Sequence, residues 1–281
     1  MKYLLLLFTC FAINVTAQTR LDFNKPLTQS VNKWVALKTA QDSVYGFGFI
    51  YMDPTAGLTA QDEGSFRITR DNKFVATKRP IYQIIKVRLD GKQLNVAWIP
   101  TEKFKELDVL ETPDWLKSYK ADTTSASYLF RWGFTYNAGN EIDKALYYLN
   151  RVQKIDPSYP GLEFGYIYAY NSGKQYSKAI AMIENALKSR PRDANLYKEL
   201  LFAQVNSGQF NKAEETYKIA MPNLSADIKA EMALNLASNY LMQKNKEKFK
   251  FWADDIQTWL PTTSARYGSF LKMKEYYATL K

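Results

Sequence analysis

The sequence contains no histidine and a single cysteine, Cys10, in 281 residues. Histidine is the usual general base near neutral pH, and cysteine is needed for disulfides and for most zinc sites. Their scarcity excludes a disulfide framework, a histidine-activated nucleophile and a cysteine–histidine metal site. We therefore expect no catalytic residue, no metal and no cofactor, and we predict that the chain is not an enzyme.

The acidic residues also lack the arrangement of a hydrolase. Asp53, Asp62 and Glu63 form the one close acidic cluster in a predicted loop. A paired-carboxylate hydrolase needs two acids at a fixed separation in a cleft. We interpret this cluster as a solvated loop, which leaves an envelope hydrolase as a disfavoured function.

An apolar run at residues 3–13 follows Lys2 at the start of the chain. It is too short to span a membrane, and the small residues after it fit a signal-peptidase site. We predict a signal peptide over residues 1–17, cleaved near Ala17. Lipidation at Cys10 and an uncleaved N-terminal anchor are the alternatives.

Cleavage would remove the cysteine and lower the formal net charge of +10 by one. An export signal without disulfides fits a bacterial envelope better than a eukaryotic secretory route. We expect an exported protein of the periplasm or cell envelope. Its positive charge favours acidic partners, but an exported protein rarely meets nucleic acid, so we expect no nucleic-acid binding.

Residues 18–100 show short alternating runs bounded by turn residues, and no helix-length stretch separates them. Asp71-Asn72 is a tight-turn pair, and Asp90-Gly91 predicts a hairpin between residues 81–89 and 93–99. We predict an antiparallel β-domain that folds as a small sandwich or open barrel.

One predicted strand, residues 44–52, places an aromatic row on one face. Rows at this spacing are most often core or a domain interface, and that is our interpretation. An exposed row would instead suit a glycan- or cell-wall-binding protein, which is the alternative function. The row consists of Tyr45, Phe47, Phe49 and Tyr51.

From residue 126 onward the sequence repeats itself every 34 residues. Ala145, Ala179 and Ala213 keep this spacing, as do Pro157 and Pro191. Each unit has two apolar-periodic runs of about a dozen residues, split by a polar turn. A period of this length indicates stacked helical hairpins.

The repeated residues resemble the tetratricopeptide repeat (TPR) family, whose pattern is large, small, aromatic, Ala, large, Pro. In the first unit the matching residues are Trp132, Gly133, Tyr136, Ala145, Leu149 and Pro157. The resemblance implies about four repeats over residues 126–261, with a degenerate fourth in which Phe249 replaces the usual small residue. It also implies an α-solenoid that binds proteins.

Residues 262–281 contain a further amphipathic stretch that we predict to be the capping helix of the solenoid. Residues 101–125 are predicted to be a linker with a short helix near Trp115, packed on the first repeat. The fold class is therefore α+β. Three segments, residues 85–104, 111–116 and 131–139, resemble secreted TPR proteins of Bacteroidetes bacteria, which implies a location and a domain order but no reaction.

In TPR proteins the first helix of each pair lines the concave side of the solenoid. Residues spaced by three or four lie on one stripe of this helix. The stripe is aromatic with amides nearby, which suits a peptide with apolar anchors. The predicted groove residues are Phe130, Phe134, Asn137, Phe164, Tyr168, Asn171, Lys198 and Phe202.

Three questions about this groove and the surface around it have alternative answers. The groove is filled either by an external partner or by the protein's own β-domain or C-terminal helix. The TPR clamp for chaperone tails needs Lys and Asn where Phe130 and Phe134 stand, so we do not expect it. A basic fourth repeat forms either a solvated helix end or a contact with an anionic envelope surface; its residues are Lys244, Lys246, Lys248 and Lys250.

The sequence thus predicts a non-enzymatic scaffold or adaptor of the bacterial cell envelope that binds a protein or peptide through its concave groove. The identity of the partner and the oligomeric state stay open.

Overall fold

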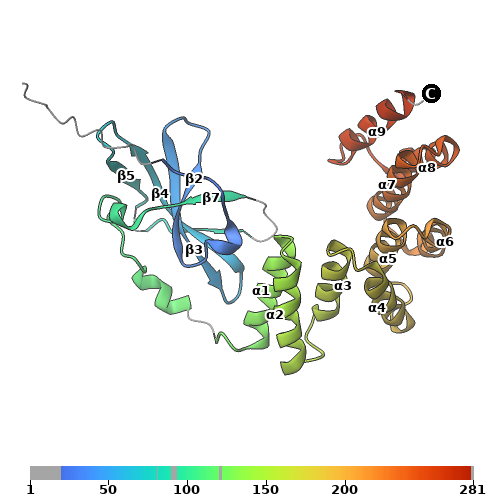
Figure 1. Cartoon of the computed structure of the whole chain (residues 1–281), viewed down its shortest axis with the longest axis horizontal. Helices are drawn as coiled ribbons and strands as arrows, with labels where there is room; N and C mark the ends of the chain where they lie inside the picture. The colour runs from blue at the N-terminus through green and yellow to red at the C-terminus, as the bar shows by residue number, and fades with distance from the viewer. Residues whose placement is uncertain (1–19, 81, 90–93, 120–121, 280–281) are drawn as a thin grey trace, which may run out of the picture. The chain divides into compact units, whose positions relative to one another are not determined.

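The structure, a computed structural model, describes residues 20–80, 82–89, 94–119 and 122–279. It divides into two compact units between residues 121 and 122, and Figure 1 shows their elements in chain order. The predicted signal peptide, with Lys2 and Cys10, lies outside the described residues. Within them, no helix has both the length and the apolar composition needed to cross a bilayer.

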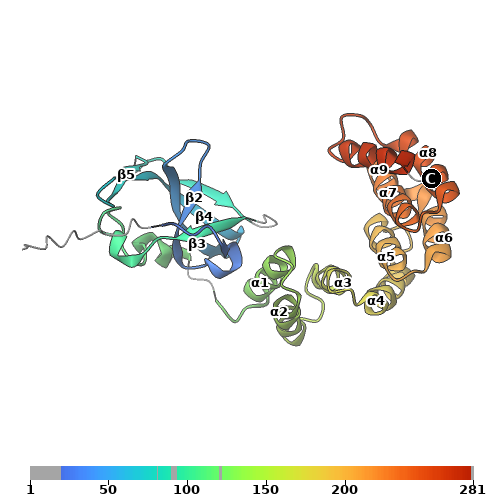
Figure 2. The ribbon, with the colours of Figure 1, turned by 45° about the horizontal axis from the view of Figure 1, so that its top comes forward.

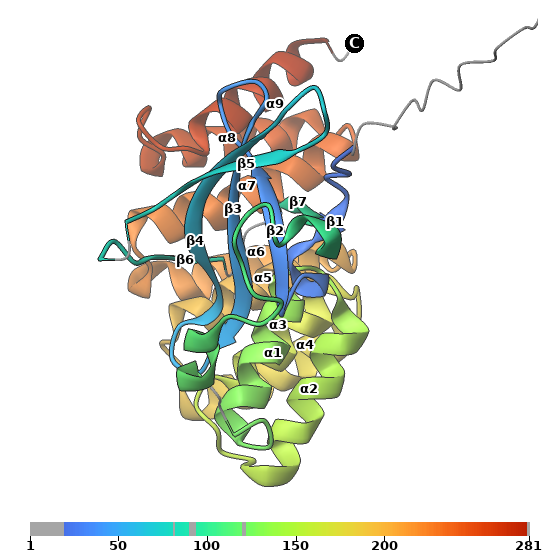
Figure 3. The same cartoon turned by 90° about the vertical axis from the view of Figure 1, so that its left-hand side faces the viewer.

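The first unit contains the predicted antiparallel sheet. Its described strands number seven and follow the order β1-β7-β2-β3-β4-β5, with β6 also paired to β4. In Figure 3, β4, β3 and β2 run side by side. The strands are β1 (Lys25–Pro26), β2 (Lys33–Lys38), β3 (Val44–Asp53), β4 (Gly57–Ile68), β5 (Phe74–Lys78), β6 (Ile85–Arg88) and β7 (Asn95–Trp98).

The turn predicted at Asp71-Asn72 joins β4 to β5. Ile68 pairs with Phe74, and the Thr69 N–H donates to the Lys73 carbonyl at 2.9 Å. Asn72 has a φ of 61°, a left-handed conformation that asparagine tolerates better than most residues. This hairpin prediction is confirmed.

The hairpin predicted around Asp90-Gly91 is wrong. The two strands that flank this pair have different partners, because β6 pairs with β4 and β7 pairs with β2 and β1. The physical reason is the length of β4, which begins at Gly57, eight residues before the predicted strand at Ser65. Its first half provides an edge for β6 that the sequence pattern did not reveal. The turn residues themselves lie outside the described part of the chain.

The aromatic row of β3 is core, as predicted. Phe47, Phe49 and Tyr51 are each 1% exposed, and they pack with Trp34 and Phe66 in one cluster. Burial of one such aromatic ring contributes several kcal/mol, on the order of 3, to folding. The row is therefore unavailable as an exposed glycan-binding face.

Residues 101–119 also belong to this core. The predicted short helix is a 3-10 helix, η3 (Asp114–Tyr119). The Trp115 ring lies edge-on against Phe49 at 5.9 Å and Tyr51 at 5.2 Å, and Leu107 is completely buried. The aromatic row of β3 is thus a packing partner of Trp115 that the sequence pattern did not predict.

The second unit is an array of helix pairs that follow one another along the chain, as the 34-residue period predicts. Its helices are α1 (Ala126–Ala138), α2 (Ile142–Ile155), α3 (Leu162–Ser172), α4 (Tyr176–Ser189), α5 (Ala194–Asn206), α6 (Phe210–Ala220), α7 (Ala226–Met242), α8 (Lys246–Trp259) and α9 (Tyr267–Thr279). The described residues thus form an α+β protein with TPR-like helices.

The period has a clear structural basis. Ala145, Ala179 and Ala213 are completely buried, which lets paired helices approach closely. The tight turn inside each pair needs one left-handed residue. That residue is Asn140 in the first pair and Gly208, with φ 79°, in the third. The glycine of the first turn, Gly139, has an ordinary φ of −80°.

Helix α9 caps the array, as predicted. Phe270 is 1% exposed in a cluster with residues of α7 and α8, and Tyr277 stacks on Phe249 at 4.7 Å. Phe249 is the large residue that departs from the TPR pattern. Its ring reaches α9, so the exceptional residue of the fourth repeat forms part of the cap.

Candidate partner-binding face

The first helices of successive pairs are direct neighbours. Helix α1 contacts α3, α3 contacts α5, and α5 contacts α7. In Figure 2 these four helices follow the inner side of the curved array, and the second helices follow the outer side. We call the surface of α1, α3, α5 and α7 on that side the inner face. All eight predicted groove residues lie on α1, α3 and α5.

Two of the predicted aromatic residues are open to solvent. Phe134 on α1 is 46% exposed, and Tyr168, at the same position of α3, is 48% exposed. The equivalent residue of α5, Phe202, is half-buried, and that of α7 is Ser238, which has no ring. The open aromatic part of the inner face is therefore confined to α1 and α3.

Phe130 has a structural role beside this open part. Its ring lies 5.0 Å from the Tyr159 ring, in the segment between α2 and α3. A Cβ atom on Gly161 would come within 3.1 Å of the same ring, and Gly161 also has a φ of 85°. Gly161 therefore satisfies both the turn and the close approach of Phe130, which fixes α1 against the start of α3.

Phe164 and Lys198 lie in charged surroundings. The Arg190 guanidinium is 5.8 Å from the Phe164 ring and forms an ion pair with Glu163. Lys198 lies 3.7 Å from a Glu231 carboxylate oxygen. These two predicted residues thus border the open part and contact charged groups of their own chain.

Glu231 extends the Lys198 contact into a network that sequence reasoning missed. It accepts a hydrogen bond of 2.8 Å from Arg266, which also donates to Asp227 at 3.1 Å. Arg266 precedes α9, so the network ties the cap to α7 and α5. Nothing in the 34-residue pattern marks Glu231, because its partner lies 35 residues away in an irregular segment.

Asn137 and Asn171 connect neighbouring first helices. The Asn137 side-chain amide donates to the Gly165 carbonyl at 3.0 Å, and that of Asn171 donates to the Glu199 carboxylate at 2.9 Å. Both side chains are buried. Their Oδ1 atoms have no hydrogen-bond partner among the described residues. The predicted amide donors are thus used inside the protein, and their geometry favours spacing the helices over holding a partner.

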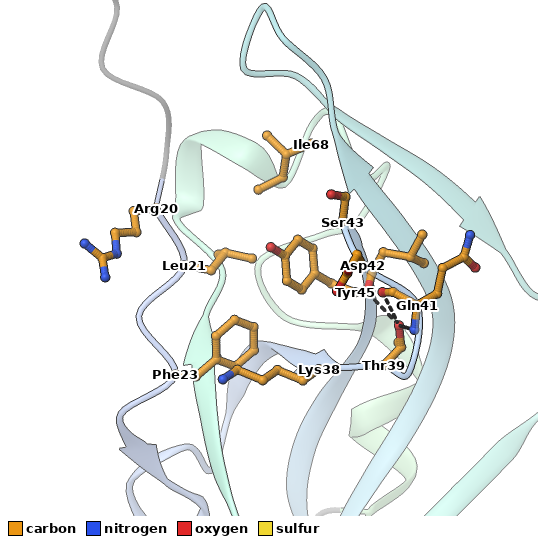
Figure 4. Close-up of a pocket in the computed structure, with 11 residues that line it drawn as sticks. Arg20, Leu21, Phe23, Lys38, Thr39, Gln41, Asp42, Ser43, Tyr45 and Ile68 are labelled. Atoms are coloured by element: carbon orange, nitrogen blue, oxygen red, sulfur yellow. Dashed lines mark hydrogen bonds between the residues drawn. The ribbon is translucent and has the colours of Figure 1, made fainter.

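The first unit contains a cavity of about 700 Å³ beside the β2–β3 turn, shown in Figure 4. Its aromatic rings already contact other side chains of the chain. Phe23 stacks on Tyr45 at 5.7 Å and carries Lys38 Nζ at 5.2 Å from its ring, and Tyr45 also contacts Phe66. Sugar rings bind by stacking on open aromatic faces, so this cavity does not support the glycan alternative.

The interpretation of the acidic cluster as a solvated loop is wrong, because Asp53 ends β3 and both Asp62 and Glu63 lie within β4. The Asp53 carboxylate accepts the backbone N–H groups of Thr55 and Ala56 at 2.8 Å, and Asp62 pairs with Arg79 at 2.6 Å. Asp53 lies opposite Gly57, so five residues of β4 separate it from Asp62, about 17 Å. This exceeds the spacing of a glycosidase carboxyl pair, about 5–9.5 Å.

The basic run of the fourth repeat is divided by its contacts. Lys248 donates to the Glu214 carboxylate at 2.8 Å, and Tyr240 donates to the same carboxylate. Burial alone would raise the pKa of Glu214, but these hydrogen bonds hold it below its usual value. Lys244 is the left-handed turn residue, whereas Lys250 is exposed on α8. The four lysines therefore do not form one uniform patch.

The remaining side chains offer few groups for chemistry near neutral pH. Burial raises the pKa of Tyr136 and of Tyr166 to about 12, so these phenols stay protonated. In the part of the chain that the structure describes, no three His, Cys, Asp or Glu side chains gather as a metal site.

No protein-family model and no curated protein sequence matches the chain. It is similar to solved TPR structures. A tetratricopeptide repeat protein from Parabacteroides merdae gives 11% identity and a TM-score of 0.45, over 63% of this chain and 63% of that one.

A thermophilic TPR protein of Thermus thermophilus gives 18% identity and a TM-score of 0.42, over 58% of this chain and 84% of that one. MamA of strain AMB-1 gives 18% identity and a TM-score of 0.39, over 51% of this chain and 83% of that one. At TM-scores below 0.5 these similarities assign no functional residue. The choice of the inner face therefore rests on the exposure and contacts described above.

Proposed function

We propose that the chain is a non-enzymatic scaffold or adaptor of the bacterial cell envelope, and that it binds a protein partner through the inner face. The observation that carries this proposal is the pair of half-exposed rings, Phe134 and Tyr168, at equivalent positions of neighbouring helices. Aromatic side chains supply large contact area at low entropic cost and are enriched at binding hot spots.

The inner face is also firmly held, which favours a binding role. Asn137 ties α1 to α3, the two helices that hold the rings, and Phe130 fixes the start of α3. A preorganised face loses little conformational entropy on binding. The two rings are therefore presented at a fixed separation.

A crosslinking pull-down from native envelopes tests this function. We expect wild type to capture a defined protein, and Phe134→Ala/Tyr168→Ala to lose it while keeping its circular dichroism spectrum. Tyr147→Ala is the matched control, because Tyr147 is 58% exposed on the second helix α2. Equal capture by wild type and the double variant would reject the inner face as the binding site.

Export is a separate part of the proposal, supported by the apolar run and the small residues that end at Ala17. Cell fractionation with N-terminal sequencing checks it, with a mature chain that starts at Gln18 as the expected result. Contact with an anionic envelope surface would rest on exposed lysines such as Lys250. It predicts binding to anionic vesicles that Lys250→Glu weakens.

A further inference from the structure

The open part of the inner face has two aromatic rings, which lie on the first helices of two successive repeats. Phe134 and Tyr168 occupy the same position on α1 and α3. These helices pack directly, as the 3.0 Å hydrogen bond from Asn137 to the Gly165 carbonyl shows. Packed helices lie about 8–10 Å apart, so the two rings are offered at about that interval across the array.

This interval discriminates between conformations of a bound segment. A β-strand returns a side chain to the same side every two residues, about 6.8 Å. A polyproline-II helix returns it every three residues, about 9.3 Å. An α-helix returns a side chain to the same side after seven residues. A helical partner also uses anchor residues three and four positions along, and the two rings of the open face leave those anchors without a binding position. The polyproline-II repeat therefore fits best.

Backbone hydrogen bonding favours the same conformation. A strand partner gains its affinity from a ladder with a sheet edge, and the inner face consists of helices whose backbone groups bond internally. The side-chain amides of Asn137 and Asn171 are also already donated within the protein. A polyproline-II backbone has no internal hydrogen bonds and stays solvated. It can therefore bind to aromatic rings of the inner face without hydrogen-bond donors from that face.

The charges beside the open face favour one orientation of the bound segment. Beyond Tyr168, the charged network of α5, α7 and Arg266 has one carboxylate more than its cations. Its members are Lys198 and Arg266 with Glu199, Glu231 and Asp227. Within these ion pairs the carboxylates outnumber the cations, although the chain as a whole carries +10. Opposite charge in a partner favours encounter and register.

We infer that the open part of the inner face binds a proline-containing polyproline-II segment of a protein partner. The segment presents one apolar side chain at every third residue to Phe134 and Tyr168, and a basic residue beyond them toward α5. This inference rests on the proposed function and names the class of its partner.

Fluorescence anisotropy with labelled nonapeptides tests it. The first peptide has two prolines before each of two leucines and before a terminal lysine. The second has the same composition, with the leucines two residues apart. We expect the full chain to bind the first peptide at least tenfold more tightly than the second, since tenfold corresponds to about 1.4 kcal/mol.

Variants locate the binding on the rings. Phe134→Ala and Tyr168→Ala should each weaken the first peptide about tenfold, whereas Tyr168→Phe, which keeps the ring, and Tyr147→Ala should not. Asp227→Asn should weaken it two- to threefold, because Asp227 is an exposed member of the network.

Equal affinity for both peptides, or binding that ignores Phe134 and Tyr168, would overturn the polyproline-II assignment. The envelope pull-down separates this failure from failure of the function. A protein captured through Phe134 and Tyr168 without proline-peptide binding rejects the partner class alone. Loss of both ring-dependent capture and ring-dependent peptide binding rejects the function as well.

Discussion

The two units place their aromatic residues in opposite ways. In the first unit the row of β3 is turned inward and Trp115 covers it, so its rings stabilise one core. In the second unit α1 and α3 leave one ring each half in water. Aromatic content alone therefore does not mark a binding site. We propose that exposure at a repeated position is the better criterion, and the following experiments test it.

Removing a ring from the first unit should have the largest effect on stability. Phe49→Ala deletes a buried ring and should cost about 3–5 kcal/mol. Phe134→Ala should cost less than about 1 kcal/mol, because half of that ring is already in water. Urea unfolding followed by near- and far-UV circular dichroism measures both, and equal losses would remove the contrast between the units.

The cap of the second unit should respond almost as strongly. Phe270→Ala should destabilise the helices by about 3 kcal/mol, since Phe270 is buried against α7 and α8. Leu271→Ala is the matched control at the next residue, which is 41% exposed. If both substitutions shift the far-UV thermal transition alike, α9 does not cap the array through Phe270.

Asn171 should affect stability and leave binding unchanged, because it joins α3 to α5 and not the two helices that hold Phe134 and Tyr168. Asn171→Ala removes the link from α3 to Glu199 and should cost about 1–2 kcal/mol. Asn239→Ala is the control, since Asn239 bonds within its own helix, to the Asn235 carbonyl. Capture of the partner by the folded Asn171→Ala protein should match wild type. Lost capture with unchanged stability would assign Asn171 to the site.

The smallest effect concerns pH and the fourth repeat. Hydrogen bonds hold the pKa of Glu214 below its usual value, so its contribution is present above the unfolded value, about pH 4.3, and is lost as the pH falls through the folded value. Glu214→Gln should cost about 1 kcal/mol at pH 7 and less at about pH 3. Urea midpoints at both pH values test this, and a pH-independent difference would contradict it.

Local features of the sequence predicted the second unit well. The spacing of Ala145, Ala179 and Ala213 corresponds to buried helix contacts, and the stretch after residue 262 holds Phe270 in the cap. Repeats contact mainly their neighbours, so a local pattern contains most of the information about their packing.

Non-local choices in the first unit were harder to predict. The Asp90-Gly91 signal is local, but pairing of β6 was decided by the free edge of a long β4. The residues before Trp115 have the local features of a helix start. Its packing partner, Phe49, lies 66 residues earlier in the chain, and no local pattern indicates it. Periodicity constrains which face is buried and does not select the neighbour that covers it.

The candidate site was predicted in part. The 34-residue spacing placed Phe134 and Tyr168 at the same position of neighbouring first helices. Their exposure then distinguished them from Phe130, whose ring is packed against the start of α3. The amides of Asn137 and Asn171 had the right spacing and internal partners that no sequence signal shows. Their acceptors, Gly165 and Glu199, lie on the next first helix and are themselves 34 residues apart, so the contact repeats with the helices.

Photo-crosslinking from single positions tests the central claim most directly. A photoreactive phenylalanine analogue is placed at position 134 and, separately, at position 147, which is the more exposed of the two and lies on α2. Irradiation of intact envelopes should link one defined protein to position 134 and none to position 147. The same linked protein at both positions, or at 147 alone, would show that the inner face is not where the partner binds.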